Sequence, residues 1–239
     1  MAKRPRLSSP PMVQPAKPVK AAKAAKATHA EGEFFRRPPV QARSRELVAR
    51  ILGATRRLLE RDGLQRLTTN HIAREAGVDV ASLYQYFASK EAILYTLAEQ
   101  WTEQVQAVYR HHLAQLDTAP ALLQSLRTMF DELQGLPDTD WNWRHLAPAM
   151  SIVPVLRDLE SEHEDRTTQF WMAWLRHHGV AWDETRLEAL ARMFYVQIDS
   201  ALTLAGRLPP DQGRWIRHWQ RRQSLALLRV CFPKRRSRR

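Results

Sequence analysis

The sequence predicts an all-helical fold, and three observations support this prediction. Glycine is scarce, with 8 in 239 residues, and no run of alternating β-branched residues indicates a strand. Apolar residues instead recur at spacings of three and four, as they do on the buried face of an amphipathic helix. The length is sufficient for a small domain followed by a larger one.

Helices are expected between clear start and stop signals, such as the residue pairs Asp62-Gly63 and Pro209-Pro210. The expected ranges are 41–62, 69–76, 80–87, 90–115, 121–134, 141–150, 154–178, 183–206 and 210–231. No apolar run approaches the roughly 18 residues needed to span a bilayer, so we expect no membrane segment. The single cysteine, Cys231, allows no internal disulfide and favours a reducing, cytoplasmic location.

The net charge of +12 is concentrated at the two ends of the chain. Residues 1–40 hold nine Lys and Arg against two Glu, and residues 233–239 hold five basic residues and no acid. The first tail is rich in Pro, Ala and Lys and cannot bury a core, so we expect it to be disordered. Both tails should attract phosphates, although the AAKAAKA stretch could equally be a transient helix on DNA or plain solvated chain.

Residues 67–90, LTTNHIAREAGVDVASLYQYFASK, predict two short helices joined by a tight turn. Thr68 and Asp79 are suited to cap the two helices, because their side chains can accept free backbone N–H groups. Gly77 stands where a left-handed residue is needed. Leu83, Tyr84 and Phe87 are expected to anchor the second helix inward, and the remaining positions to face outward.

The outward positions of the second helix suit contact with a DNA major groove. Ala81 and Ser82 are small and permit close approach of the backbone, and the amide of Gln85 can bond adenine bidentately. Tyr86 and Lys90 are spaced to reach phosphates. This pattern indicates a helix-turn-helix.

The stretch GVDVASLYQYFASKE resembles the signature of the TetR/AcrR-type repressors, whose usual form is close to GVS-x-G-x-LYYHF-x-SKE. The stretch TTNHIAREAG resembles the first helix-turn-helix element of that family, and the likeness covers roughly residues 43–101. Two positions depart from the pattern: Ala81 replaces a frequent Gly, and Gln85 replaces a frequent second Tyr. The second departure means that the operator cannot be inferred from relatives.

The resemblance implies a homeodomain-like three-helix DNA-binding domain followed by a helical ligand-binding and dimerisation domain. The expected divisions are a disordered tail 1–40, a DNA-binding domain 41–101 with its motif at 67–86, a helical domain 102–232 and a basic tail 233–239. The resemblance also implies that Arg43 and Arg45 approach the phosphate backbone or minor groove. The equal alternative is that these two arginines belong to a solvated basic face. The residues expected to contact DNA are Thr69, Asn70, Val80, Ala81, Ser82, Tyr84, Gln85, Tyr86 and Lys90.

The last two helices carry long apolar faces that need a partner. The resemblance implies that they pair with their copies in a homodimer, and a two-fold dimer would double the contacts on a palindromic operator. The alternative is that these faces complete the core of the monomer, and both can hold on different sides of each helix.

Tryptophans and other large apolar residues gather in the middle of the chain. They could line a pocket for an apolar or aromatic effector, or they could form plain core. His163 and Thr167 share a face with them and could orient a ligand. His163 could instead be a core residue bonded to a carboxylate such as Asp131 or to a backbone carbonyl. The candidate ligand-binding residues are Met129, Phe130, Trp141, Met150, His163, Thr167, Phe170 and Trp174.

Catalysis has little support in the sequence. The pairs His111-His112 and His177-His178 are adjacent and point to different helix faces, no cysteine cluster offers a metal site, and no Gly-rich phosphate loop or nucleophile elbow is present. We therefore expect no cofactor, no metal and no enzymatic activity. The leading hypothesis is a ligand-responsive repressor at the nucleoid. The alternatives are a nucleoid-associated protein of the same fold without a ligand, and an enzyme or carrier that retains the helical core.

Overall fold

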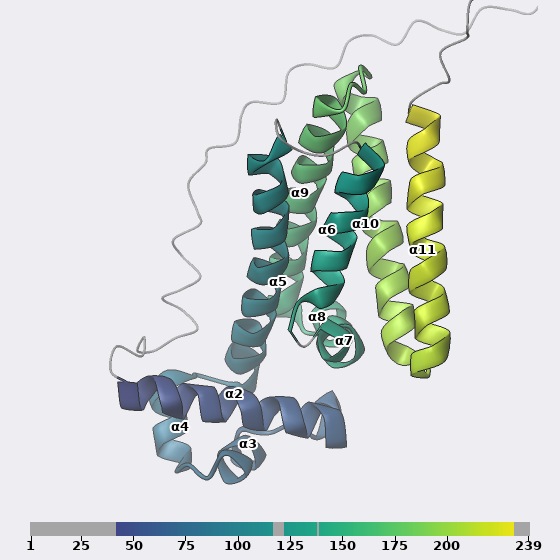
Figure 1. The fold of residues 1–239 in the computed structure, drawn as a ribbon. Coiled ribbons are helices and arrows are strands. Elements are labelled where there is room, and N and C mark those ends of the chain that lie inside the picture. The colour runs from purple at the N-terminus through teal and green to yellow at the C-terminus, as the bar shows by residue number, and fades with distance from the viewer. Residues whose placement is uncertain (1–41, 117–121, 138, 232–239) are drawn as a thin grey trace, which may run out of the picture.

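The computed structural model describes residues 42–116, 122–137 and 139–231. Within these ranges all regular elements are helices, which confirms the predicted fold class (Figure 1). The expectations for the tails 1–40 and 233–239 concern residues outside these ranges, as do the expected helix starts at Gln41 and Ala121.

Two long helices and three short elements form the lower part of the molecule. In Figure 1, α2 (Ala42–Asp62) lies across this end, with α3 (Thr69–Ala76) and α4 (Val80–Tyr86) beneath it. The 3-10 turn η1 (Leu64–Arg66) joins α2 to α3, and α5 (Lys90–Ala114) rises from this base into the upper part. Among the described residues, no helix is long and apolar enough to cross a membrane.

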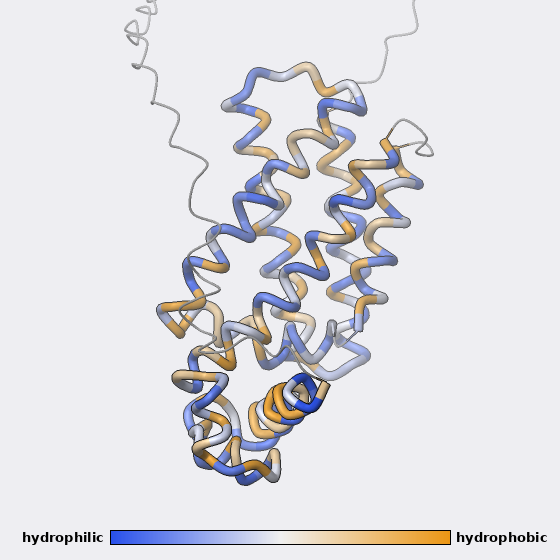
Figure 2. Tube along the Cα trace, turned by 90° about the vertical axis from the view of Figure 1, so that its left-hand side faces the viewer, coloured by the Kyte–Doolittle hydropathy of each residue, from blue (hydrophilic) through white to orange (hydrophobic). Residues whose placement is uncertain are grey.

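The upper part is a bundle in which α5 and four later long helices run side by side (Figure 1). Figure 2 shows apolar and polar positions mixed along each helix, the pattern of amphipathic helices that bury one face. The later elements are α6 (Leu122–Gly135), α7 (Thr139–Trp141), the π-helical segment η3 (Asn142–Leu146), α8 (Ala147–Ile152), α9 (Pro154–His177), α10 (Glu184–Arg207) and α11 (Pro210–Cys231).

The predicted helix at 141–150 is wrong in its details, while the other described helix ends lie within one residue of the prediction. Three short pieces replace it, with a π-helical stretch at Asn142–Leu146. Pro148 stands at the start of α8. Because proline has no backbone N–H, it cannot continue the regular hydrogen-bond ladder of the preceding turns.

Two buried cores meet along α5. The first joins α2, α3, α4 and the first half of α5 to residues of η3, α8 and the start of α9, and it includes Trp101, Leu146 and Leu156. The second joins the upper half of α5 to α6, α9, α10 and α11, and it includes Trp171 and Phe194. The first core therefore extends beyond residue 101 into residues 146–159. The division at 101/102 stays a prediction.

A close approach between α10 and η3 closes the lower end of the bundle. Arg144 donates from Nε to the carbonyl oxygen of Gly206 over 2.6 Å. A Cβ at Gly206 would lie 3.0 Å from the backbone nitrogen of Arg144 and 3.0 Å from the carbonyl carbon of Trp143. The two backbones can pack this closely only because residue 206 has no side chain.

We expect Gly206→Ala to lower the free energy of unfolding by about 1–3 kcal/mol, the usual cost of overpacking a filled site. Urea unfolding followed by circular dichroism measures this change. Gly135→Ala is the matched control, because a Cβ there would meet no atom within 4 Å. It should leave stability unchanged or raise it slightly through helix propensity. Equal losses in the two variants would contradict the packing argument.

Candidate functional site

Side-chain caps fix the start of each helix in the helix-turn-helix. Thr68 accepts a hydrogen bond from the backbone N–H of His71 at 3.2 Å, and Asp79 accepts one from Ala81 at 3.1 Å. Ser89 caps α5 in the same way. These bonds satisfy N–H groups that the first turn of a helix leaves free. The predicted caps are confirmed.

The turn between α3 and α4 depends on Gly77. This residue has φ 62° and ψ 40°, the left-handed conformation predicted from its position. The backbone N–H of the next residue, Val78, bonds the carbonyl of Ala73 at 3.0 Å, which closes the end of α3.

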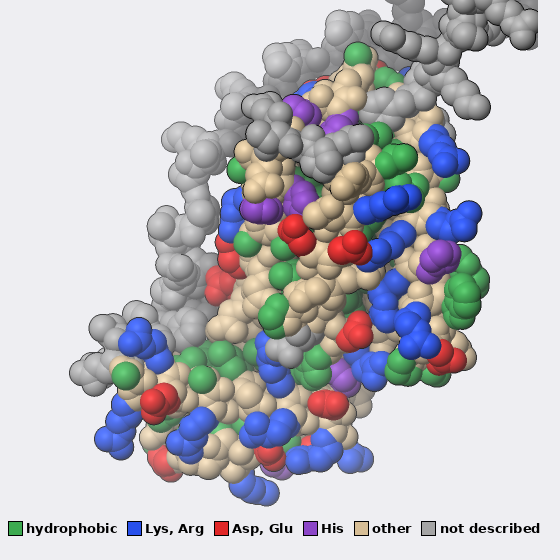
Figure 3. All heavy atoms as spheres, in the orientation of Figure 1, with side chains coloured by type: hydrophobic (Ala, Val, Ile, Leu, Met, Phe, Trp, Pro, Cys, Tyr) green, Lys and Arg blue, Asp and Glu red, His purple; other side chains and the backbone are tan. Residues whose placement is uncertain are grey.

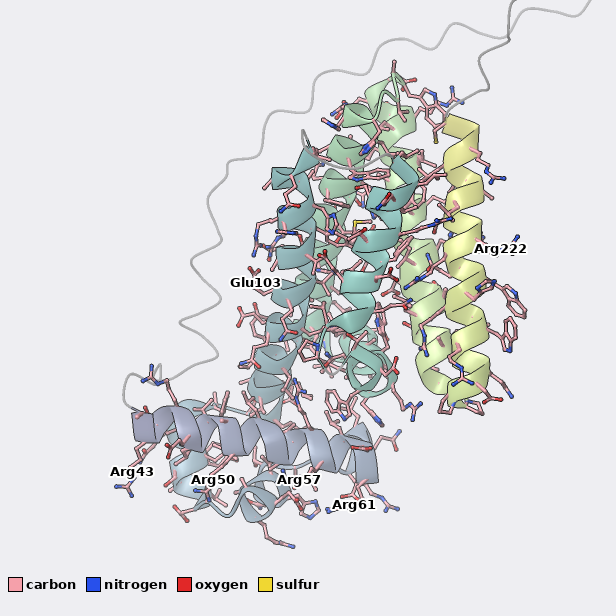
Figure 4. All side chains as sticks on the ribbon, in the orientation of Figure 1. Arg43, Arg50, Arg57, Arg61, Glu103 and Arg222 are labelled. Atoms are coloured by element: carbon pink, nitrogen blue, oxygen red, sulfur yellow. The ribbon has the colours of Figure 1, made fainter. Side chains whose placement is uncertain are left out.

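Arginines of α2 hold the C-terminal end of α3, a role that sequence analysis missed. Arg50 donates to the carbonyl of Ala76 from Nε at 3.1 Å and from Nη2 at 2.7 Å, and it also reaches the carbonyl of Gly77. Arg57 and Arg61 both bond Glu75, at 2.8 and 3.3 Å. Figure 4 shows these arginines along α2. No local pattern indicates such contacts, because the partners are 14–27 residues apart.

The expected orientations of two tyrosines in α4 are wrong. Tyr84 was expected to anchor the helix inward, yet its side chain is 39% exposed. Tyr86 was expected to face outward, yet it is partly buried against the first core. The buried anchors of α4 are Leu83 and Phe87, and Tyr86 lies three residues from Leu83 on the same side of the helix.

The outer surface of α4 presents the residues that the sequence proposed for base contact. Ala81 and Gln85 are exposed, and Ser82 and Val80 are half-buried. The hydroxyl of Tyr84 bonds Thr69 Oγ1 at 2.9 Å, which ties the outer face of α4 to the start of α3. The preceding helix also contributes Asn70, which is exposed beside Thr69.

Lys90 has an intramolecular contact. Its ammonium donates to the backbone carbonyl of Leu67 at 3.1 Å and so ties the start of α5 to the segment before α3. An ammonium has three N–H donors, so this bond leaves others available for an external acceptor. Phosphate contact by Lys90 stays a prediction.

A cavity of about 160 Å³ lies within the upper part. Residues of α5, α6, α9 and α10 line it, together with the segment from α7 to α8. Its lining is mainly apolar and aromatic, with Trp101, Trp143, Trp171, Tyr109 and Phe130 among the walls.

The cavity contains half of the proposed ligand-binding residues. Phe130, Met150, His163 and Thr167 line it. Four others do not: Met129, Trp141, Phe170 and Trp174. Met129 and Trp174 are fully buried in the second core. The spacing of aromatic residues located the region, but it could not tell which rings face the cavity and which face the neighbouring helices.

The hydrogen-bond partner expected for His163 is wrong. Nδ1 of His163 lies 3.2 Å from Nε2 of Gln106, which also donates to Thr167 Oγ1 at 2.9 Å. Asp131, one of the two proposed alternatives beside a backbone carbonyl, instead pairs with Arg221 at 2.7 Å. Burial, with a smaller effect of the positive charge on Arg166, lowers the pKa of His163 to about 4. The imidazole is therefore neutral at physiological pH.

Two acidic side chains line the cavity close to one another. Burial, with the negative charges of Glu160 and Glu164, raises the pKa of Asp199 to about 6. Burial also raises the pKa of Glu160 above its ordinary value. Glu164 pairs with Arg192 at 2.8 Å on the outside of the bundle. The cavity thus combines aromatic walls with an acidic end.

Aromatic contacts connect the cavity wall to the lower helices. Trp101 of α5 packs edge-on against Trp143 of η3, with 4.8 Å between ring centroids, and both line the cavity. The guanidinium carbon of Arg56 in α2 lies 5.0 Å from the ring centroid of Trp141 in α7. A movement of the segment from α7 to α8 would therefore change its contacts with α2 and α5.

Comparison with known proteins finds a family model that matches this part of the chain. Residues 51–96 match the family model described as bacterial regulatory proteins, tetR family. In this range the chain is similar to proteins of the tetR family. The matched range contains the whole of α3 and α4 with their caps.

The chain is also similar to a curated protein in part of its sequence and to solved structures in its fold. An HTH-type transcriptional regulator of Haemophilus influenzae is 27% identical over 117 residues, which are 48% of this chain and 56% of that protein. The match therefore spans little more than half of that relative. A transcriptional regulator from Rhodococcus sp. Rha1 aligns with a TM-score of 0.61 at 16% identity, over 77% of this chain and 96% of that one. Thermus thermophilus FadR in complex with lauroyl-CoA aligns with a TM-score of 0.54 at 21% identity, over 80% and 98%.

We expect Asp199→Asn to raise the free energy of unfolding above pH 6. The wild-type carboxyl has a folded pKa of about 6 against an ordinary 3.8, so folding takes up a proton between these values. Stability of the wild type therefore falls as pH rises through this window, whereas the amide carries no such cost. The gain should be near zero at pH 4 and about 1–3 kcal/mol at pH 7.5.

Urea unfolding at pH 4, 5, 6 and 7.5 measures this gain. Asp158→Asn, which neutralises an exposed carboxyl on α9, is the matched control. A gain from Asp199→Asn that does not change between pH 4 and pH 7.5 would contradict the assignment of the raised pKa.

Proposed function

We propose that the protein is a homodimeric, ligand-responsive repressor that binds a palindromic DNA operator at the nucleoid. The observation that carries the proposal is the outer surface of α4, a capped helix on which Ala81 and Gln85 are exposed and Ser82 is half-buried. A helix of this kind fits a major groove, because the backbone can approach the base edges.

Within this proposal, side chains of α4 contact the bases. Neighbouring residues contact phosphates and so fix the position of α4 on the DNA. Ala81, Ser82 and Gln85 meet base edges, with Gln85 able to bond adenine bidentately. Thr69, Tyr86 and Lys90 are proposed for phosphates, and the exposed hydroxyl of Tyr84 adds a donor beside Thr69. Arg43 and Arg45, exposed at the start of α2, add phosphate contacts at the edge of the site.

Basic residues surround this surface. Figure 3 shows Lys and Arg side chains gathered over the lower part of the molecule and along α11. Phosphate contacts by such residues contribute affinity that weakens as salt rises, without contributing sequence preference. Affinity and specificity should therefore respond to different substitutions.

The proposed dimer forms through α10 and α11. Of the eight large apolar side chains that are exposed in the described part of the chain, five belong to these helices: Met193, Val196, Leu204, Trp215 and Trp219. Those of α10 recur at near-helical spacing, and the two tryptophans stack at 6.0 Å between ring centroids. An exposed apolar face of this kind marks a contact surface, and a second copy in two-fold symmetry supplies a matching one.

The cavity is proposed as the effector site. Its walls include Trp101 and Trp143, which belong to or pack against the first core, so an occupant would contact the core that carries α3 and α4. A ligand that fits one arrangement of these walls better than another would shift the spacing of the two recognition helices in the dimer. FadR, with its lauroyl-CoA complex, supports ligand binding in proteins of this fold.

A second candidate is a nucleoid-associated protein of the same fold that has no ligand. The charge of residues 1–40 and 233–239 favours it, because both tails are strongly basic. Selection of genomic fragments by the purified protein at physiological salt separates the two. A palindrome in a few promoters supports the repressor, and hundreds of sites without a motif support the alternative.

We expect Gln85→Ala to relax sequence preference at one position of each half-site by about 1–3 kcal/mol, because the amide would no longer discriminate the base. Affinity for unrelated DNA should change little. The test is a binding selection from random DNA, followed by titration of the selected site and its single-base variants.

Gln104→Ala is the matched control for this experiment. It removes an exposed glutamine from α5, away from the α4 surface. An unchanged base preference in Gln85→Ala would show that this side chain does not read the operator.

We expect Trp219→Arg to dissociate the dimer, because it removes a large apolar contact and places like charges near the two-fold axis. A loss of about 2 kcal/mol or more, roughly thirtyfold in the dimer dissociation constant, is typical of a tryptophan at the centre of an interface. Light scattering across a concentration series measures it. Ile152→Arg controls for surface charge, since this residue is 64% exposed on α8. Dissociation by both variants, or by neither, would argue against this interface.

A further inference from the structure

We propose that the cavity binds an organic cation with an aromatic or apolar body, with its positive charge held between Asp199 and Glu160. The inference rests on the proposed role of the cavity as the effector site, and it names the class of ligand. It follows from the unbalanced charge on the walls and from their aromatic faces, and a buried donor without a partner lies on the same wall.

The acidic end of the cavity lacks a counterion. Neither Asp199 nor Glu160 has a hydrogen bond or an ion pair with another described residue. Arg207 also lines the cavity, but it lies eight residues after Asp199, about 12 Å along α10, and is exposed. Nearby Arg192 is engaged by Glu164, Asp165 and Glu188. The positive charges around the cavity are thus distant or already paired.

The opposite walls suit a positive charge on an apolar body. Trp101, Trp143 and Trp171 line the cavity together with Tyr109. The faces of aromatic rings carry a negative electrostatic potential that attracts cations, and tryptophan is the most effective of them. Rings and carboxylates therefore favour the same sign of charge in an occupant.

A second unsatisfied group lies on the same wall. Trp171 is completely buried and lines the cavity, and its indole nitrogen has no hydrogen-bond partner among the described residues. Buried donors of this kind are normally paired. The wall therefore has both acidic oxygens without a counterion and a donor without an acceptor among the described residues.

The charge of a ligand determines whether the cavity favours it. A carboxylate removed from water costs free energy unless it is paired, and the raised pKa of Asp199 reflects that cost. An anionic ligand would add repulsion, and a neutral one would leave the cost in place. A cation removes this cost, so the affinity of the cavity for a cation should rise as Asp199 ionises. The other titratable groups facing Asp199 are Glu160, Glu164, Tyr195 and Tyr109, and neutral His163 lies on the same wall.

The test compares three probes of similar size on the purified full-length protein without DNA. Phenyltrimethylammonium is the cation, tert-butylbenzene is its neutral isostere, and benzoate is the anion. Calorimetry and tryptophan fluorescence measure binding at pH 5 and pH 8. We expect the cation to bind at least about tenfold more tightly than either other probe at pH 8, with a smaller preference at pH 5.

The variant Asp199→Asn with Glu160→Gln should abolish the preference for the cation. Glu162→Gln neutralises an exposed carboxyl of α9, the helix that also carries Glu160. It is the matched control and should keep the preference for the cation. If the double variant fails to fold, Asp199→Asn alone serves, with at least a partial loss expected. Equal or tighter binding of the neutral or anionic probe would overturn the proposal, as would a cation preference that survives these substitutions.

The same probes, added to the protein on its selected DNA site, separate this inference from the proposed function. Tight binding of tert-butylbenzene or benzoate with release of DNA would leave the repressor in place and overturn only the ligand class. Failure of all three probes to bind would overturn the cation site, while operator recognition by the dimer is measured without any ligand.

Discussion

Trp101 of α5 packs edge-on against Trp143 of η3, and the rest of the molecule is arranged around the core to which this contact belongs. Below it lie the buried residues of α2, α3 and α4, and above it lie the cavity and the second core. Because protein interiors are close-packed, a shift of one wall cannot be absorbed by empty space. The orientation of α4 and the shape of the cavity therefore depend on each other through the packing of this core.

The recognition elements are too short to be stable alone. Helices α3 and α4 have eight and seven residues, and isolated helices of this length are not stable in water. Their stability comes from the buried side chains, from the caps and from the hydrogen bonds of Arg50 to the end of α3. The surface proposed to read bases is thus held at its inner side by these contacts, while its outer side is exposed.

The sequence predicted the features that depend on local rules. Thr68, Gly77 and Asp79 were assigned correctly, because caps and left-handed turns require particular residue types at particular positions. The orientations of Tyr84 and Tyr86 were wrong, since both residues suit either face and tertiary packing decided between them. Asp199 and Glu160 were missed as cavity residues, and Gln106 was missed as the partner of His163 and Thr167, for a related reason. Their significance arises from helices that meet in space, and a single sequence does not record which faces meet.

Helix α10 carries three different kinds of residue at different angles around its axis. Tyr195 and Asp199 face the cavity, Val196 and Leu204 lie exposed on another side, and Gly206 touches the backbone of η3. Under the proposed function, mutations in this one helix should therefore separate into three phenotypes: altered ligand choice, altered assembly and loss of the fold. Ligand preference could then change over evolution through positions such as 195 and 199 while the other two surfaces stay as they are. Residue 206 would have no such freedom.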